Sequence, residues 1–225
     1  MRNMDTVLIM NGRLYISHER YMWSIDIDGK IYKKPLLLTD YMKFLPESFT
    51  RLTAAYQAPS GNIVLFANNM SYMLTYPRVT LVSGWPKAYT DLGIPDANAK
   101  INAVLNTNEG RTFVIYNDNL VGEIDDCSMT IVKFYQIEMI FPGIPHNVSS
   151  AFRYIDGNLY FISKNRFYRF NEFTKTVTAS GKFDLEILGI TCPREGLMTQ
   201  LRDLLSRFVR IDTRQRETSN RGEEE

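Results

Sequence analysis

The sequence predicts an all-β protein, a four-bladed β-propeller with a C-terminal amphipathic helical tail. Two observations predict the propeller. A three-residue segment, polar or small at its start and apolar at its end, occurs four times at intervals of 48, 49 and 47 positions. A turn glycine follows each copy after 7 or 8 positions, and a run rich in β-branched and aromatic residues follows each glycine. The segments begin at Asp5, Thr53, Asn102 and Ser149, and the glycines are Gly12, Gly61, Gly110 and Gly157.

Each copy has the pattern of a small antiparallel sheet, because its apolar runs are short and end at Gly, Asn or Asp. Asn11-Gly12 and Asp156-Gly157 are typical hairpin turns, since these residue types tolerate positive φ. In chain order, we expect second strands at 14–16, 63–66, 112–115 and 159–162, third strands that include 20–23 and 166–170, and closing Pro-bearing segments at 44–46, 92–95 and 141–145.

A unit of four strands cannot bury both of its faces, so the copies must pack against one another. Radial packing gives a propeller and linear stacking gives a solenoid, but solenoid repeats are usually shorter and need polar end caps that the sequence lacks. We therefore expect one propeller domain over 4–193, with repeats at about 4–48, 49–97, 98–145 and 146–193.

The last part of the chain, 194–225, is expected to be helical and then disordered. Apolar residues recur there at helical spacing, and the charged end from 214 onward is too polar to pack. The apolar positions are Met198, Leu201, Leu204, Leu205 and Phe208.

Composition excludes several classes. The net charge of +1 argues against a nucleic-acid-binding surface, and no apolar run is long enough for a transmembrane segment. Residues 1–5 lack the apolar core of a signal peptide. With only His18 and His146 in the chain, a zinc site of three histidines cannot be built. The start of a zinc-protease motif at His18-Glu19 is broken by Met22, and we expect Asp125-Asp126 to form a solvated turn.

The fourth repeat carries a recognisable motif. Residues 157–171, GNLYFISKNRFYRFN, resemble the G-x-x-Y-F-F-x-G-x-x-Y-W-R-F-D pattern of hemopexin-like domains. The segments Gly84-Trp85-Pro86-Lys87 and Leu92-Gly93-Ile94-Pro95 resemble the connection between blades in that family. Over roughly 4–192, the chain is most similar to the C-terminal domain of a matrix metalloproteinase. The third repeat departs from the pattern at Leu120-Val121-Gly122-Glu123, which puts the packing of that blade in doubt.

The resemblance implies a cation in the central tunnel, at the first residue of each repeat segment. The family usually has Asp at these positions, whereas this chain has Asp5, Thr53, Asn102 and Ser149. Calcium prefers several oxygen ligands with some anionic charge, so a weakened calcium site is expected. The alternative is that these side chains only cap strand starts and bind water.

The resemblance also implies a disulfide between a Cys before blade one and a Cys at the end of blade four. Cys192 matches the second position, and the partner is expected upstream of this chain, because residues 2–4 contain no Cys. Cys127 is expected to be a free thiol. Asn69 and Asn147 begin Asn-x-Ser sequons and are candidates for glycosylation in an extracellular protein.

For function, the resemblance implies a non-catalytic protein-recognition domain that binds matrix components, protease substrates or inhibitors. The chain alone is expected not to be an enzyme but the accessory domain of a secreted or membrane-type zinc metalloendopeptidase, with the zinc outside this chain. The alternative is a carrier of haem or another small ligand, like hemopexin itself.

Overall fold

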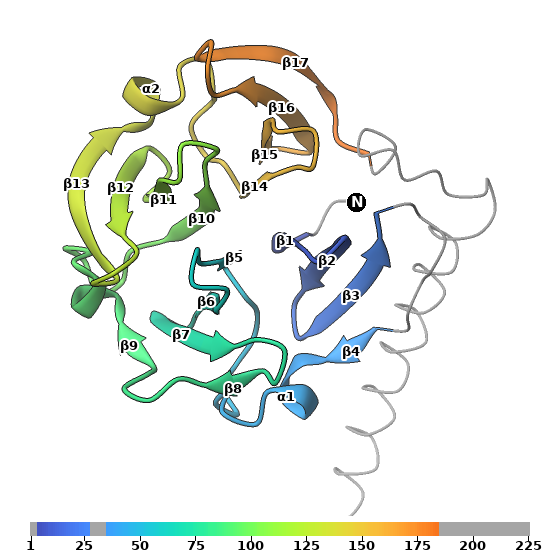
Figure 1. The fold of residues 1–225 in the computed structure, drawn as a ribbon, viewed down its shortest axis with the longest axis vertical. Coiled ribbons are helices and arrows are strands. Elements are labelled where there is room, and N and C mark those ends of the chain that lie inside the picture. Colours follow the sequence, from blue (N-terminus) through green and yellow to red (C-terminus); the bar gives the residue numbers. More distant parts are fainter. Residues whose placement is uncertain (1–3, 28–34, 185–225) are drawn as a thin grey trace, which may run out of the picture.

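Four antiparallel sheets surround a central axis in the computed structural model (Figure 1). The structure describes residues 4–27 and 35–184. The predictions for Cys192 and for the tail at 194–225 lie outside these residues. The first two sheets contain β1 (Thr6–Met10), β2 (Arg13–His18), β3 (Tyr21–Asp26) and β4 (Leu36–Leu37), then β5 (Ala54–Gln57), β6 (Ile63–Ala67), β7 (Met70–Thr75), β8 (Thr80–Leu81) and β9 (Lys87–Ala88).

The third and fourth sheets have the same up-and-down order. They contain β10 (Ile101–Asn106), β11 (Thr112–Tyr116), β12 (Leu120–Asp125) and β13 (Thr130–Gln136), then β14 (Ser150–Arg153), β15 (Leu159–Ser163), β16 (Arg166–Asn171) and β17 (Thr176–Lys182). The second sheet differs only at its outer edge, where β8 and β9 each pair with part of β7. The expected four-bladed β-propeller is confirmed, with one blade for each sequence repeat.

The first strand of every blade lies nearest the axis. β1 contacts β5 and β14, and β10 contacts β5 and β14, so the four inner strands close a ring. Each of the four hydrophobic clusters lies between two neighbouring blades, as between blades two and three, where Phe66 and Val114 are fully buried. The core therefore consists of the contacts between blades, which is why one repeat could not fold alone.

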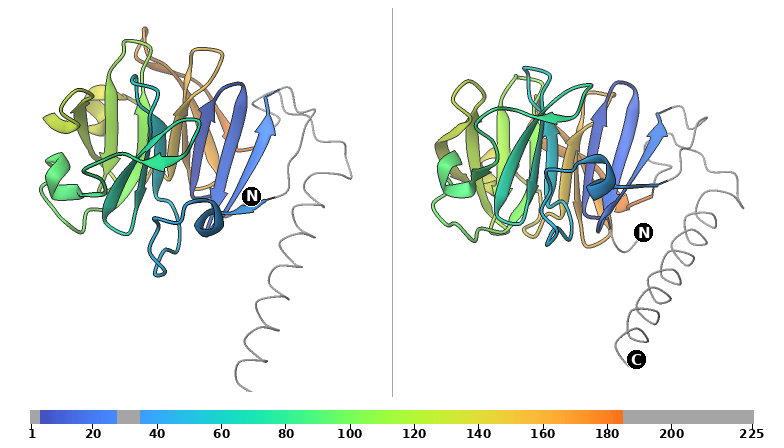
Figure 2. Two further views of the ribbon diagram at one scale, coloured as in Figure 1. Left: turned by 60° about the horizontal axis from the view of Figure 1, so that its bottom comes forward. Right: turned by 90° about the horizontal axis from the view of Figure 1, so that it is seen from below.

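Short helical turns connect the outer strand of one blade to the inner strand of the next. They are α1 (Leu38–Tyr41), η1 (Tyr89–Leu92) and α2 (Ile137–Ile140), and they lie at the outer rim (Figures 1 and 2). Each turn buries its first residue, and the Pro-bearing segments after them bury Leu45, Ile94 and Ile144. These apolar anchors hold the connections against the blades.

Blade three keeps its packing despite its altered third strand. Gly122 lies against the side chain of Ile131, so close that a Cβ on Gly122 would approach Ile131 Cδ1 to 2.6 Å. On the other face, Arg111 binds Glu123 through two nitrogens at 2.9 and 2.8 Å, and Tyr135 donates to the same carboxylate at 2.9 Å. A glycine and a charged network thus replace the aromatic residues of the other blades.

Candidate binding sites at the two ends of the axis

The four predicted cation ligands lie at the same end of the axis: Asp5, Thr53 and Ser149 directly precede their inner strands, and Asn102 is the second residue of β10. In every blade, the residue that follows the candidate pairs with the equivalent position of the second strand: Thr6 with Ser17, Ala54 with Phe66, Ala103 with Ile115 and Ser150 with Ile162. Asp5, Thr53, Asn102 and Ser149 are therefore structurally equivalent. We call this end of the axis the amino-terminal mouth.

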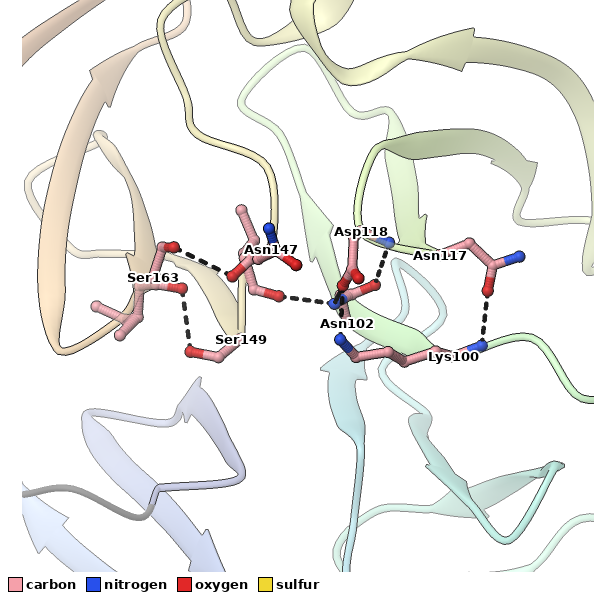
Figure 3. A network of polar contacts seen from close by, with 9 residues as sticks. Lys100, Asn102, Asn117, Asp118, Asn147, Ser149 and Ser163 are labelled. Carbon is pink, nitrogen blue, oxygen red and sulfur yellow. Dashed lines mark hydrogen bonds and ion pairs between the residues drawn. The ribbon is translucent and has the colours of Figure 1, made fainter.

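Asn102 is buried, 4% exposed, and all of its amide atoms have partners (Figure 3). Its Nδ2 donates to Asp118 Oδ1 at 2.8 Å and to the carbonyl of Val148 at 2.9 Å, while its Oδ1 accepts the backbone N–H of Asp118 at 3.0 Å. Val148 belongs to the start of blade four, so the Asn102 side chain joins blades three and four.

Asp118 lies in the tight turn between β11 and β12, with a positive φ of 71°. Lys100 Nζ donates to its carboxylate at 2.6 Å. The hydrogen bond from Lys100, followed by that from Asn102, holds the pKa of Asp118 below its ordinary value. The carboxylate is thus ionised and neutralised within the protein.

Thr53 and Ser149 make equivalent hydrogen bonds, each within its own blade. Each hydroxyl donates to a carbonyl of the second strand in its own blade at 3.1 Å, Thr53 to that of Phe66. Ser149 donates to that of Ile162 (Figure 3). Tyr89, whose pKa burial raises to about 12, also hydrogen-bonds to Thr53. These hydroxyls cap strand starts, although each oxygen retains some capacity to accept.

Asp5 is the one carboxylate among the four candidates. It accepts the backbone N–H of Glu19, Arg51 Nη1 lies 3.6 Å from its Oδ1, and His18 Nδ1 lies 3.7 Å from its Oδ2. Within residues 4–27 and 35–184, no group of three or more His, Cys, Asp or Glu residues is placed to hold a metal. The four candidate side chains thus offer a cation one carboxylate, that of Asp5, with His18 and Arg51 close by.

The opposite end of the axis contains a cavity of about 280 Å³. Its walls come from all four inner strands and from the turns after β1 and β14, at 7–12, 55–57, 104–106 and 151–155. Arg153, at the end of β14, contributes the positive charge of this lining. We call this end the carboxyl-terminal mouth.

Polar side chains tie neighbouring blades together around the carboxyl-terminal mouth. Asn106 Nδ2 donates to the carbonyl of Gln57, which links blades two and three. Arg153 Nη1 donates to the carbonyl of Thr107 at 3.1 Å, which links blades four and three. These contacts hold the cavity walls in register.

Glu172, 2% exposed, forms a further contact between blades three and four. It accepts hydrogen bonds from the backbone N–H of Asn108 at 2.6 Å, from Asn108 Nδ2 at 3.0 Å and from the backbone N–H of Glu109 at 3.4 Å. A buried carboxylate requires such donors, because without them its desolvation would be costly.

The Asp125-Asp126 pair differs in part from the expected solvated turn. Asp125 does close the turn, since it accepts from the N–H groups of Cys127 and Ser128. Asp126 points inward instead: Thr112 donates to its Oδ2 at 2.7 Å, while its Oδ1 is buried and has no hydrogen-bond partner among the described residues. Burial, followed by the charge of Asp125, raises the pKa of Asp126.

The remaining sequence candidates lie at the surface. Asn69 and Asn147 are exposed at tight turns with positive φ, and Asn69 Nδ2 donates to Asn98 Oδ1 at 2.9 Å. Cys127 is an exposed free thiol, as expected. His146 pairs with Glu138 on the outside of blade three, far along the chain from His18.

Sequence reasoning missed the carboxyl-terminal mouth. Arg153 and Thr107 are 46 positions apart, and Glu172 and Asn108 are 64 apart, so neither contact has a local sequence signal. The repeat spacing could have placed Gln57, Asn106 and Arg153 at equivalent positions, since each ends an inner strand.

No protein-family model matches the chain. The chain is 28% identical over 75% of its length to matrix metalloproteinase-2 of Drosophila melanogaster, and 25% identical over 77% of its length to matrix metalloproteinase-18 of Xenopus laevis. It spans only 22% and 36% of those relatives, in their C-terminal regions.

Among solved structures, a hemopexin-fold protein from cow pea is similar over 84% of this chain and 97% of its own, with a TM-score of 0.68 and 12% identity. A plant albumin from Cicer arietinum is similar over 83% of this chain and 96% of its own, with a TM-score of 0.67 and 14% identity. At these identities the two structures support the fold alone. The four repeats, the closed ring of blades and the metalloproteinase matches together show that this chain is a hemopexin-like domain.

Proposed function

We propose that this domain is a non-catalytic protein-recognition module, an exosite that steers or regulates the proteolysis performed by a zinc metalloendopeptidase. The similarity to matrix metalloproteinases extends over 75% of this chain but only 22% of one such relative, which supports an accessory role within a larger protein. We place the partners among matrix components, protease substrates and inhibitors, and the setting outside the cell.

The shape of the domain supports protein partners over small ligands. The axial cavity of about 280 Å³ is slightly smaller than the ~300–1,000 Å³ typical of small-molecule pockets. The two histidines belong to different blades and are each close to an acidic side chain, His18 to Asp5 and His146 to Glu138. This favours recognition by broad surfaces over the alternative, a carrier of haem. No helix among the described residues has the length and apolar character to cross a bilayer.

Affinity capture tests this proposal. The purified full chain is immobilised and exposed to an extracellular-matrix extract, next to the same chain unfolded by heat and next to an unrelated propeller. The proposal expects matrix proteins, metalloproteinase substrates or inhibitors on the folded chain only. Recovery of haem or another small ligand, without any enriched protein, would support the carrier instead.

We also propose a weak calcium site at the amino-terminal mouth. Asp5 supplies one carboxylate, and further oxygens would have to come from the backbone and from the hydroxyls of Thr53 and Ser149. Asn102 is the least suited candidate, because its oxygen already accepts from Asp118 and its nitrogen donates twice. Hard cations bind more weakly as ligand charge is lost, so we expect a small calcium-induced thermal shift.

A further inference from the structure

We propose that the carboxyl-terminal mouth, with Arg153 at its edge, is a docking site for an acidic side chain of a partner protein. This inference rests on the proposed protein-recognition function and specifies one contact for it. It is independent of the proposed calcium site, whose candidate ligands lie at the other end of the axis.

The first argument is the charge of Arg153. Its Nη1 donates to the carbonyl of Thr107 at 3.1 Å, which fixes the guanidinium beside the cavity. No ion pair of Arg153 occurs among residues 4–27 and 35–184. The planar guanidinium has five N–H donors, so the contact with Thr107 leaves most of them for a ligand.

The second argument is that the acidic side chains in the turns of blade four, to which Arg153 belongs, are held by other partners. On this face, the turns of blade four contain two acidic residues, Asp156 and Glu172. Asp156 accepts from the backbone N–H and the side-chain amide of Asn158, both at 3.0 Å, and from the hydroxyl of Tyr160 at 2.8 Å. The Glu172 carboxylate accepts hydrogen bonds from the backbone and side-chain amides of Asn108 and from the backbone amide of Glu109. Neither carboxylate neutralises Arg153.

The third argument is the surface around the cavity. Ile155 lines the cavity and is 66% exposed, and Phe173 is 72% exposed in the turn between β16 and β17. Because β14 and β16 end on the same side of an antiparallel sheet, both apolar side chains lie on the face that contains the mouth. Arg153 and the exposed Ile155 thus line one cavity, and a further apolar side chain is exposed on the same face, which suits a partner that presents both charged and apolar groups.

The positive charge of Arg153 favours an acidic side chain as the group that binds at the carboxyl-terminal mouth. A carboxylate binds a guanidinium through two parallel hydrogen bonds, which a neutral amide cannot reproduce. The cavity has room for a short acidic side chain, and Ile155 at its lining, with Phe173 exposed on the same face, would contact apolar residues next to the acidic one. The partner is thus a protein segment with Asp or Glu between apolar residues.

A capped peptide tests the site: Gly-Leu-Asp-Leu-Gly carrying a fluorophore, with its Asn counterpart as the matched ligand. Fluorescence anisotropy with the full chain is expected to show binding of the Asp peptide, with at least about tenfold weaker binding of the Asn peptide. Arg153→Gln is expected to remove this preference and Arg153→Lys to retain part of it. Arg78→Gln, which removes the same charge from the β7–β8 turn, should change nothing.

Equal binding of the two peptides, or undiminished binding to Arg153→Gln, would overturn the inference. Competition by acetate at the same concentration as the Asp peptide would show a small-anion site and would also overturn it. Matrix proteins captured equally by wild type and Arg153→Gln, with no peptide bound, would reject this site and leave the proposed function standing. Capture of no protein by either chain would reject the proposed function itself.

Discussion

Asn102 and Asp118 hold each other through two hydrogen bonds that run in opposite directions. The Asn102 amide donates to the Asp118 carboxylate at 2.8 Å, and the Asp118 backbone N–H donates to the Asn102 oxygen at 3.0 Å. At this position, hemopexin-like relatives are expected to carry Asp. The neutral amide therefore makes two donations, to Asp118 and to the Val148 carbonyl, that an aspartate at this position could not make.

The Asn102→Asp substitution should lower the stability of the protein without calcium and make its stability depend more strongly on calcium. A carboxylate cannot donate to Asp118 or to the Val148 carbonyl and would repel the Asp118 charge, so we expect a loss of about 1–3 kcal/mol in the absence of calcium. Calcium should restore part of the lost stability, and the calcium-induced increase in Tm should be larger for Asn102→Asp than for wild type. Adding Thr53→Asp and Ser149→Asp should enlarge the shift further. Equal shifts in wild type and variant, measured by differential scanning fluorimetry, would contradict the proposed weak site.

Ionisation of the buried Asp126 side chain should lower the stability of the protein as the pH rises. Burial raises its pKa in the folded state, so folding favours the protonated form, and this advantage is lost as pH rises from the ordinary aspartate pKa through the raised one. Asp126→Asn cannot ionise, so its Tm relative to wild type should increase between pH 3.5 and pH 7. A difference in Tm that stays constant across this range would show that Asp126 is not perturbed.

Glu123 should have the opposite pH dependence. The hydrogen bond from Arg111, followed by that from Tyr135, lowers its pKa in the folded state. Its contribution is present above the unfolded-state pKa and is lost as the pH falls through the lowered folded-state value. Glu123→Gln should therefore cost about 1 kcal/mol at pH 7 and much less near pH 3, in chemical unfolding at both pH values. Glu47→Gln, at an exposed position, is the matched control and should show no such difference.

Gly122 should resist substitution because of Ile131. In Gly122→Ala, the new Cβ would lie 2.6 Å from Ile131 Cδ1, so the isoleucine must shift, and we expect a loss of about 1–2 kcal/mol. Ile131→Val deletes that methyl group. The double variant should lose less stability than the sum of the two single variants in a double-mutant cycle. Additive losses would place the cost of Gly122→Ala elsewhere.

The repeats made the fold predictable. Turn glycines such as Gly61 and Gly110, nearly fifty residues apart, mark the same hairpin in consecutive blades, and the need to bury both faces of each sheet required a closed ring. The equivalence of Asp5, Thr53, Asn102 and Ser149 followed from the same spacing.

The chemistry of the two mouths was less predictable, because it depends on contacts that do not repeat. The sequence contains Asn102 but does not reveal that Asp118 and Val148 occupy its amide. Asp126 turns inward while Asp125 closes the turn, and no local pattern distinguishes two adjacent aspartates. No local pattern distinguishes Arg153, because its contact with Thr107 forms between blades.

Equilibrium binding measured side by side for proteins and haem tests the recognition function. The full chain is titrated, in one biosensor format, onto immobilised fibrillar collagen, gelatin, fibronectin and a tissue inhibitor of metalloproteinases, and haem binding is followed in parallel by Soret absorbance. We predict saturable, salt-sensitive binding to at least one of these proteins and no stoichiometric haem complex. A stoichiometric haem complex together with no binding to any of the proteins would contradict the proposal that this domain recognises proteins.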